Sequence, residues 1–216
     1  QCAHQLEETG AQMAILPAGV MTGTLEKGAV FQSDVERVVP ENAELVTARL
    51  TVADLAALLE QGVSKLSRNE SEQIDATSAW DGFPQVGGFS WEYDVSAPEG
   101  ERLQYIRYDG QELELTDCQS TYMVVSVPAL FDGSMGYPAY SFERTGTELR
   151  QALRDYCSAR DSIAVPASRS TAIGTASYPI KDRLPVMAVV IVGVLIALVA
   201  SIPKWKEEKH FSFRGK

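Results

Sequence analysis

The chain has 216 residues, of which 45% are hydrophobic, and its formal net charge is −10. That length allows one domain of about 150–180 residues with extra segments, and the hydrophobic content is sufficient for a buried core. The acidic balance argues against a nucleic-acid partner, because binding to phosphates requires a basic surface.

Short strands alternate with capped helices in the first third of the chain. Residues 13–16 are an apolar run that predicts a buried strand, and Ser33 with Glu36 forms a capping box for a short helix. The alternation over residues 44–50 predicts a second strand. Thr51 then predicts the N-cap of an amphipathic helix. The inward positions of this helix are Leu55, Leu58, Leu59, Val63 and Leu66.

Residues 83–95 predict a long strand that is interrupted by two glycines, Gly87 and Gly88. Its aromatic side chains recur at every second position. These side chains are Phe89, Trp91 and Tyr93. They could form an exposed stacking platform or the packed face of a sheet, and a period of two beside a helix favours the packed face.

A return strand is predicted at residues 102–108, and the Asp109-Gly110 dipeptide that follows it is a hairpin signal. Residues 121–127 predict a buried strand, residues 128–140 a loop, and residues 146–159 a final helix. The mixture of helices and antiparallel hairpins predicts an α+β fold.

The composition divides the chain into four parts. Residues 1–160 form the predicted domain, and residues 161–183 are rich in Ser, Ala, Thr and Pro, which is typical of a linker. Residues 184–202 contain no charge, and as a helix of 19 residues they would span about 28 Å, which is close to the hydrocarbon thickness of a bilayer. This pattern predicts one transmembrane helix with the lipid bilayer as a partner.

The segment after the predicted helix, residues 203–216, is basic. Residues 204–216 carry a net charge of +3, which leaves −13 on the rest of the chain. By the positive-inside rule this tail is cytoplasmic, so the domain is expected outside the cytoplasm, attached to the cell membrane by a single span. The chain begins at Gln1 without a targeting signal, from which we expect a preceding amino-terminal part.

The sequence offers few ligands for a metal. Its two histidines are His4 and His210, near opposite ends, and no cysteine belongs to a C-x-x-C pair. We therefore expect no metal and no other cofactor in this chain. Cys118 and Cys157 could form a disulfide in an extracytoplasmic domain, although nothing in the sequence sets their distance.

Residues 83–94 read Phe-Pro-Gln-Val-Gly-Gly-Phe-Ser-Trp-Glu-Tyr-Asp. This stretch resembles the F-L-Q-V-G-G-I-x-x-x-Y-D strand in the carboxy-terminal domain of the 5′-nucleotidase family. The helix after residue 50, the Asp109-Gly110 hairpin and the strand at residues 122–125 follow in the same order as in the family. The resemblance extends over residues 6–140.

The resemblance implies a division of labour between two domains. In the family, an amino-terminal metallophosphoesterase domain holds two metals, and the carboxy-terminal domain binds the nucleoside between two aromatic rings. It implies that the divalent metals belong to a preceding domain, and that this chain is not catalytic by itself but contributes to a phosphoric-monoester hydrolase. Its ligand would be a nucleoside or nucleotide.

Several of the family's substrate contacts are replaced here. The early Asn and Arg are absent from residues 16–22, and Pro40 is followed by Glu41 where the family has an aromatic residue. The second aromatic belongs to a glycine-rich loop, which corresponds to residues 128–137. After a small shift in register, the resemblance implies substrate contacts in this loop. They are Phe131, Asp132, Gly133 and Tyr137.

Two functions therefore remain open. The chain could be the nucleoside-binding part of a membrane-bound nucleotide hydrolase. It could also be a non-enzymatic surface module, a pseudoenzyme that kept the fold and lost the nucleotide site, because fold and site are separate matters. A third class, adhesion or polymer binding through exposed aromatic residues, has no positive sign in the sequence.

Overall fold

The computed structural model describes residues 11–23, 25, 28–39, 43–158, 161–162 and 168–175. In chain order its elements are β1 (Met13–Pro17), η1 (Ala18–Val20), α2 (Gln32–Val38), β2 (Glu44–Thr51), α3 (Val52–Val63), η2 (Ala76–Ser78), β3 (Pro84–Gly87), β4 (Phe89–Asp94), β5 (Leu103–Tyr108), β6 (Gln111–Glu112), β7 (Thr121–Ser126), α4 (Pro128–Phe131), β8 (Glu143–Glu148), α5 (Leu149–Ser158) and β9 (Ser170–Ile173).

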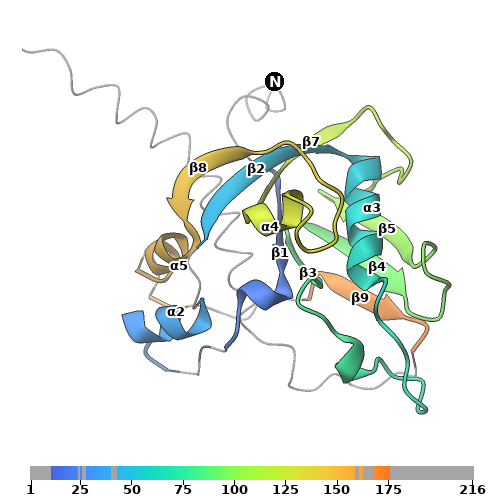
Figure 1. The fold of residues 1–216 in the computed structure, drawn as a ribbon, viewed down its shortest axis with the longest axis horizontal. Coiled ribbons are helices and arrows are strands. Elements are labelled where there is room, and N and C mark those ends of the chain that lie inside the picture. Colours follow the sequence, from blue (N-terminus) through green and yellow to red (C-terminus); the bar gives the residue numbers. More distant parts are fainter. Residues whose placement is uncertain are drawn as a thin grey trace, which may run out of the picture.

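These elements build two mixed sheets, which confirms the predicted α+β class (Figure 1). The five-stranded sheet has the order β3-β1-β7-β2-β8, in which only β1 and β7 run parallel. The four-stranded sheet has the order β6-β5-β4-β9, in which only β4 and β9 run parallel.

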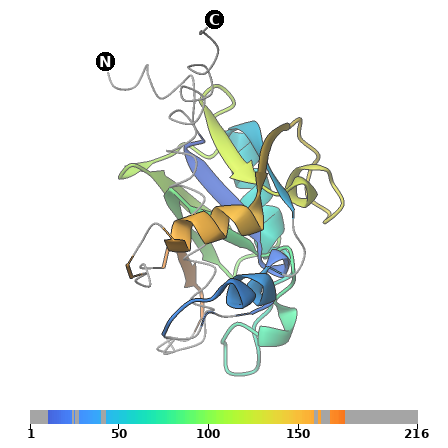
Figure 2. The same cartoon turned by 90° about the vertical axis from the view of Figure 1, so that its left-hand side faces the viewer.

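The five-stranded sheet is buried on both faces, because alternate residues of its strands belong to two different cores. Met13 and Ile15 of β1 pack with α3 and the second sheet, whereas Ala14 and Leu16 pack with α2 and α5. Helices α2 and α5 lie side by side on that second face (Figure 2). The sheet is thus the middle layer of three.

The interrupted strand at residues 83–95 belongs to both sheets. β3 pairs with β1, and β4 pairs with β5, so the chain changes sheet between them. Gly88 makes this change with a φ of 86°, and an added Cβ would lie 2.5 Å from the carbonyl oxygen of Gln12. Phe89, Trp91 and Tyr93 are all buried, which confirms that they are the packed face of a sheet.

The helix at Thr51 forms as predicted, whereas the helix near Ser33 begins earlier. Thr51 Oγ1 accepts a hydrogen bond from Asp54 N at 3.1 Å, and Thr51 N donates to Asp54 Oδ2 at 2.9 Å. At α2 the N-cap is Phe31, whose N–H donates to Asp34 Oδ2 at 2.9 Å. The side chain that accepts from the N-cap backbone is therefore that of Asp34 rather than Glu36, and the N-cap is not Ser33.

Two elements differ from the sequence-based prediction in the last third of the chain. The short helix α4 occupies the start of the region predicted as a loop, since Pro128 suits the first turn of a helix. β8 precedes α5 where the sequence predicts a helix from residue 146. β8 is a polar edge strand, so it lacks the alternation that reveals a half-buried strand.

Strand β9 lies within residues 161–183, for which composition predicts a linker, and there the structure differs. Trp91 N donates to Arg169 O at 2.9 Å, and Trp91 Nε1 donates to Ser170 Oγ at 2.8 Å. The edge of β4 therefore supplies hydrogen-bond partners for this segment, which its composition does not indicate.

In the ranges that the structure describes, no helix has the length and apolar character to cross a bilayer. The predicted span at residues 184–202 and the basic tail at 203–216 lie outside the described residues.

Candidate functional site

Two described connecting segments leave from one edge of the five-stranded sheet. β1 and β7 are parallel, with Ala14 opposite Val125, so the segments that follow them leave from the same edge. β2 is antiparallel to β7, with Val46 opposite Ser126, so β2 begins at this edge. We call residues 17–22 after β1 the β1 loop, and residues 128–137 after β7 the glycine loop. Residues 40–42, which precede β2 in the chain, lie outside the described residues.

The β1 loop is held mainly by backbone hydrogen bonds. Ala18 N donates to Phe83 O at 2.9 Å, and Gly19 N donates to Asp81 O at 2.7 Å. A Cβ added to Gly19 would lie 2.5 Å from Asp81 Cβ, so the two segments are in close contact. One wall of the site is therefore fixed against residues 81–83.

Both aromatic residues proposed for substrate stacking are buried. Phe131 is 0% exposed and packs edge-on against Tyr140, with ring centroids 6.4 Å apart. Tyr137 is 3% exposed, stacks on Trp80 at 5.7 Å and donates its hydroxyl to Gly82 O. Burial raises the pKa of the Tyr137 phenol, so it stays a donor at physiological pH. Neither ring offers a free face to a base.

Asp132 and Gly133 lie nearer the surface of the same loop. Asp132 is exposed, and its Oδ1 accepts a hydrogen bond from Ser134 N at 2.8 Å. Hydrogen bonds from Ser134 lower the pKa of Asp132, so its carboxylate is charged at neutral pH. Gly133 has a φ of 82°, which turns the chain after α4. Of the four predicted contacts, Asp132 is the one whose polar group reaches solvent.

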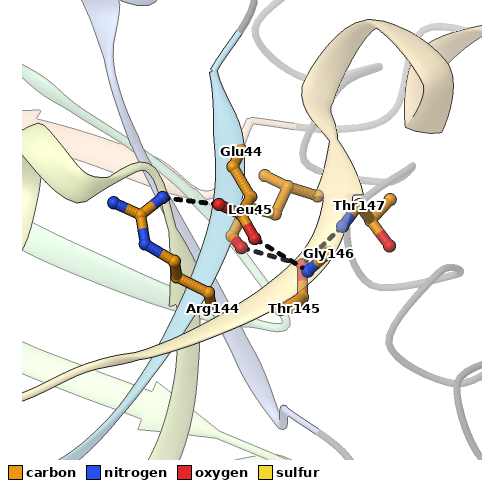
Figure 3. A network of polar contacts seen from close by, with 6 residues as sticks. All are labelled: Glu44, Leu45, Arg144, Thr145, Gly146 and Thr147. Carbon is orange, nitrogen blue, oxygen red and sulfur yellow. Dashed lines mark hydrogen bonds and ion pairs between the residues drawn. The ribbon is translucent and has the colours of Figure 1, made fainter.

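Glu44 fixes the start of β2 at this edge (Figure 3). Its carboxylate accepts from the Arg144 guanidinium and, at 2.9 Å, from Gly146 N. Thr145 Oγ1 donates to Leu45 O at 2.8 Å, so three successive residues of β8 bind the first residues of β2. The hydrogen bonds from Arg144 and Gly146 lower the pKa of Glu44. The chain after residues 40–42 therefore has a defined position.

Positive charge reaches the edge through two arginines. Arg37 is paired with Asp34, with 3.2 Å between Nη2 and Oδ1, and its side chain is 50% exposed. Arg150 Nε donates to Val39 O at 2.6 Å, at the end of α2. Arg37 and Arg150 therefore both lie on the α2 side of the sheet, close to the end of α2.

The described residues do not fit a two-metal centre. Among the residues that the structure covers, no group of three or more His, Cys, Asp or Glu side chains is placed to hold a metal ion. Both histidines, His4 and His210, lie outside the described residues.

Cys118 and Cys157 are not joined by a disulfide. Cys118 is exposed in the turn before β7, next to the end of β2 at Thr51, and its thiol contacts Thr116 O at 3.5 Å. Cys157 is on α5, which follows β8 and begins at the opposite end of β2, near Glu44.

Residues 80–83 contact both loops of the site, and sequence reasoning missed them. Asp81-Gly82 is a turn dipeptide, and this signal could have indicated a tight turn before β3. Nothing in the sequence indicates that the carbonyl groups of this turn accept hydrogen bonds from the β1 loop and from Tyr137. These bonds depend on tertiary structure rather than on a motif.

The comparisons with known proteins agree with this architecture. The trifunctional nucleotide phosphoesterase YfkN of Bacillus subtilis is 25% identical over 150 residues, which are 68% of this chain and 10% of that protein. A 5′-nucleotidase precursor from Thermus thermophilus has the same fold, with a TM-score of 0.63 and 22% identity, over 75% of this chain and 31% of that one.

The Haemophilus influenzae NAD nucleotidase also shares the fold, with a TM-score of 0.60 and 17% identity, over 79% of this chain and 32% of that one. The chain thus spans about a tenth of the curated relative and about a third of each solved structure. The profile of the 5′-nucleotidase C-terminal domain matches residues 1–142. The chain therefore belongs to the 5′-nucleotidase family, as a C-terminal domain of that family.

Proposed function

We propose that the chain is the substrate-binding C-terminal domain of a nucleotide hydrolase, and that it binds a nucleoside or nucleotide without hydrolysing it. The proposal is supported by the meeting of the β1 loop and the glycine loop at one edge of the sheet, where β2 begins, in a domain of this family. A preceding metallophosphoesterase domain would supply the divalent metals, because the described residues do not fit a metal centre.

Calorimetry on the 216-residue chain with adenosine and AMP tests this proposal. We expect heat of binding with both ligands and no release of phosphate from AMP by the chain alone. Asp132→Ala should weaken binding, and Asp109→Ala, an exposed aspartate in the β5–β6 turn, is the matched control. Phosphate release by the purified chain would contradict the division of labour.

A second candidate function is favoured by the burial of Phe131 and Tyr137. Stacking of a base on an exposed aromatic ring contributes about 1–3 kcal/mol, and neither ring is available for it. The chain would then be a non-enzymatic surface module that kept the fold. The absence of heat with either ligand at millimolar concentration would support this candidate and contradict nucleoside binding.

We propose in addition that residues 184–202 anchor the domain on the outer side of the cell membrane, with the tail at 203–216 in the cytoplasm. The uncharged run and the basic residues after it support this arrangement. The chain should remain in the membrane pellet after an alkaline carbonate wash, and deletion of residues 184–216 should release it. External protease should digest the domain in intact cells and leave an epitope placed after Lys216 protected. Release of the undeleted chain, or loss of the epitope, would contradict the proposed anchor.

A further inference from the structure

Three successive carbonyl groups, those of Asp81, Gly82 and Phe83, accept hydrogen bonds from the two described walls of the site. The β1 loop donates to the outer two, from Gly19 N at 2.7 Å and from Ala18 N at 2.9 Å. The glycine loop donates to the middle one, from the hydroxyl of Tyr137 to Gly82 O. Residues 81–83, which we call the bridging turn, therefore connect the two loops.

The bridging turn is itself held firmly in place. Phe83 N donates to Trp80 O at 2.9 Å, which closes the turn, and Trp80 Nε1 donates to Gly62 O at 2.9 Å, which fixes it to α3. The Trp80 ring covers Gly82 so closely that no Cβ fits there. Lys65 Nζ lies 4.0 Å from the centroid of the same ring.

Tyr137 has the contacts of a positioning group rather than of a ligand contact. Its ring stacks on Trp80, with an angle of 22° between the planes, and its hydroxyl has a carbonyl of the bridging turn as partner. A displacement of Tyr137 must therefore move Gly82, and Gly82 cannot move without Asp81 and Phe83, to which it is covalently joined.

We propose that Tyr137 is a positioning residue of the candidate site, which couples the glycine loop to residues 18–20 through the backbone of the bridging turn. The proposal rests on the proposed function in one respect, that the two loops are walls of the same site. The coupling itself does not depend on which ligand binds, so it is measured without ligand.

The test is amide hydrogen exchange on the full chain in detergent micelles. Tyr137→Phe keeps the ring and removes its single hydroxyl, so Gly82 O loses its partner. We expect exchange of the Ala18 and Gly19 amides to increase by about threefold to tenfold, the effect of weakening one hydrogen bond. Exchange is expressed relative to the amides of β7, so a global loss of stability, which raises all rates together, is separated from the local effect.

Tyr140→Phe is the matched control. It makes the same chemical change three residues away, but Tyr140 donates its hydroxyl to Asp54 O at 3.3 Å, at the start of α3. This variant should leave the exchange of Ala18 and Gly19 unchanged. Equal increases in the two variants, or no increase in Tyr137→Phe, would overturn the proposal.

Coupling is reciprocal, so a perturbation from the other side gives a second measurement. Gly19→Ala places a methyl group against Asp81 and should raise the exchange of the Gly136 amide, which donates to Gly133 O at 3.1 Å in the glycine loop. This variant does not alter Tyr137, so the proposal stays testable if Tyr137→Phe fails to fold. Unchanged exchange at Gly136 would also overturn it. Failure of adenosine to bind, in contrast, would remove the proposed ligand and leave these rates unaffected.

Discussion

Single residues decide where the helices of this domain begin. Thr51 and Asp54 satisfy each other's polar groups at the start of α3. Thr51→Ala should lower the free energy of unfolding by about 1 kcal/mol, because it leaves a helical N–H without a partner. Ser33→Ala is the control, since Ser33 lies inside α2 and its change should have little effect. Urea denaturation measures both, and an equal loss from Ser33→Ala would place the start of α2 at Ser33.

Arg102 closes the other end of α3. Its Nη1 donates to the carbonyl oxygens of Val63, Ser64 and Leu66, and Glu60 accepts from the backbone on either side of it. Arg102→Ala leaves these carbonyl groups without a charged donor and should cost about 2 kcal/mol of stability.

Arg107→Ala is the matched control for this prediction, because Arg107 is on the strand that follows Arg102. It pairs with Glu112 at 3.5 Å, and its side chain is 44% exposed. Exposed pairs contribute about 0–1 kcal/mol, so this change should be nearly neutral in thermal or chemical denaturation. Comparable losses from the two variants would show that Arg102 acts as a surface charge and not as a cap.

The sequence predicts the structural role of a single residue well only when its hydrogen-bond partner is close in the chain. Thr51 is recognisable as a cap because Asp54 is three residues away. Arg102 is not, because the acceptors of its Nη1 lie more than 35 residues earlier. A large separation in the chain likewise explains Tyr137, for which the loop motif indicates a ligand contact, whereas packing against Trp80 buries the ring.

Among the elements, β8 depends on the charge of Glu44. Hydrogen bonds from Arg144 and Gly146 lower the pKa of Glu44 below its usual value of 4.5. A carboxyl group whose pKa is lower in the folded state stabilises the fold above its unfolded pKa, and this contribution is lost as the pH falls through the folded pKa. The pairing of β8 with β2 should therefore weaken below about pH 4.5.

Glu44→Gln tests this expectation. The variant should be less stable than the unchanged chain at pH 7, and the difference should shrink as the pH falls below 4.5, because both forms then lack the charge. Glu143→Gln is a control in the neighbouring strand, since Glu143 is exposed. Denaturation midpoints between about pH 3 and pH 7 measure the effect. A constant difference over that range would show that the charge of Glu44 has no role.

The elements that the sequence predicts are strands buried on both faces and helices with a continuous apolar stripe. β1, β2, β7 and α3 carry runs of apolar residues that are found buried. The sequence does not predict β8 and β9, because each is an edge strand with polar or small residues, for which backbone pairing is the main interaction. Backbone pairing leaves no trace in a pattern of side chains.

For the molecule as a whole, β9 extends the folded domain beyond α5. The profile of the family stops at residue 142, and composition places the boundary at 160, yet the chain returns at Ser170–Ile173 to pair with β4. Besides the bonds of Trp91, Val95 N donates to Ile173 O at 3.1 Å and Arg68 donates to Gly174 O at 3.2 Å. Each end of β9 is thus tied to a different part of the domain.

A chain ending at residue 160 should therefore be less stable than one ending at residue 175. At least these four hydrogen bonds would be lost, besides the pairing of β9 with β4, which at about 0.5–1.5 kcal/mol each amounts to at least about 2–6 kcal/mol. Ser170→Ala in the longer chain separates the side-chain share, because it removes the partner of Trp91 Nε1 alone and should cost about 1 kcal/mol. Urea denaturation of the three proteins measures the order. If the two chain lengths unfold at the same urea concentration, β9 does not contribute to the fold, and residues 161–183 are then the linker that their composition indicates.

If the longer chain is more stable, any membrane anchor at residues 184–202 begins within about nine residues of β9. An extended segment of that length reaches about 30 Å at most, so the anchor would hold the domain close to the bilayer.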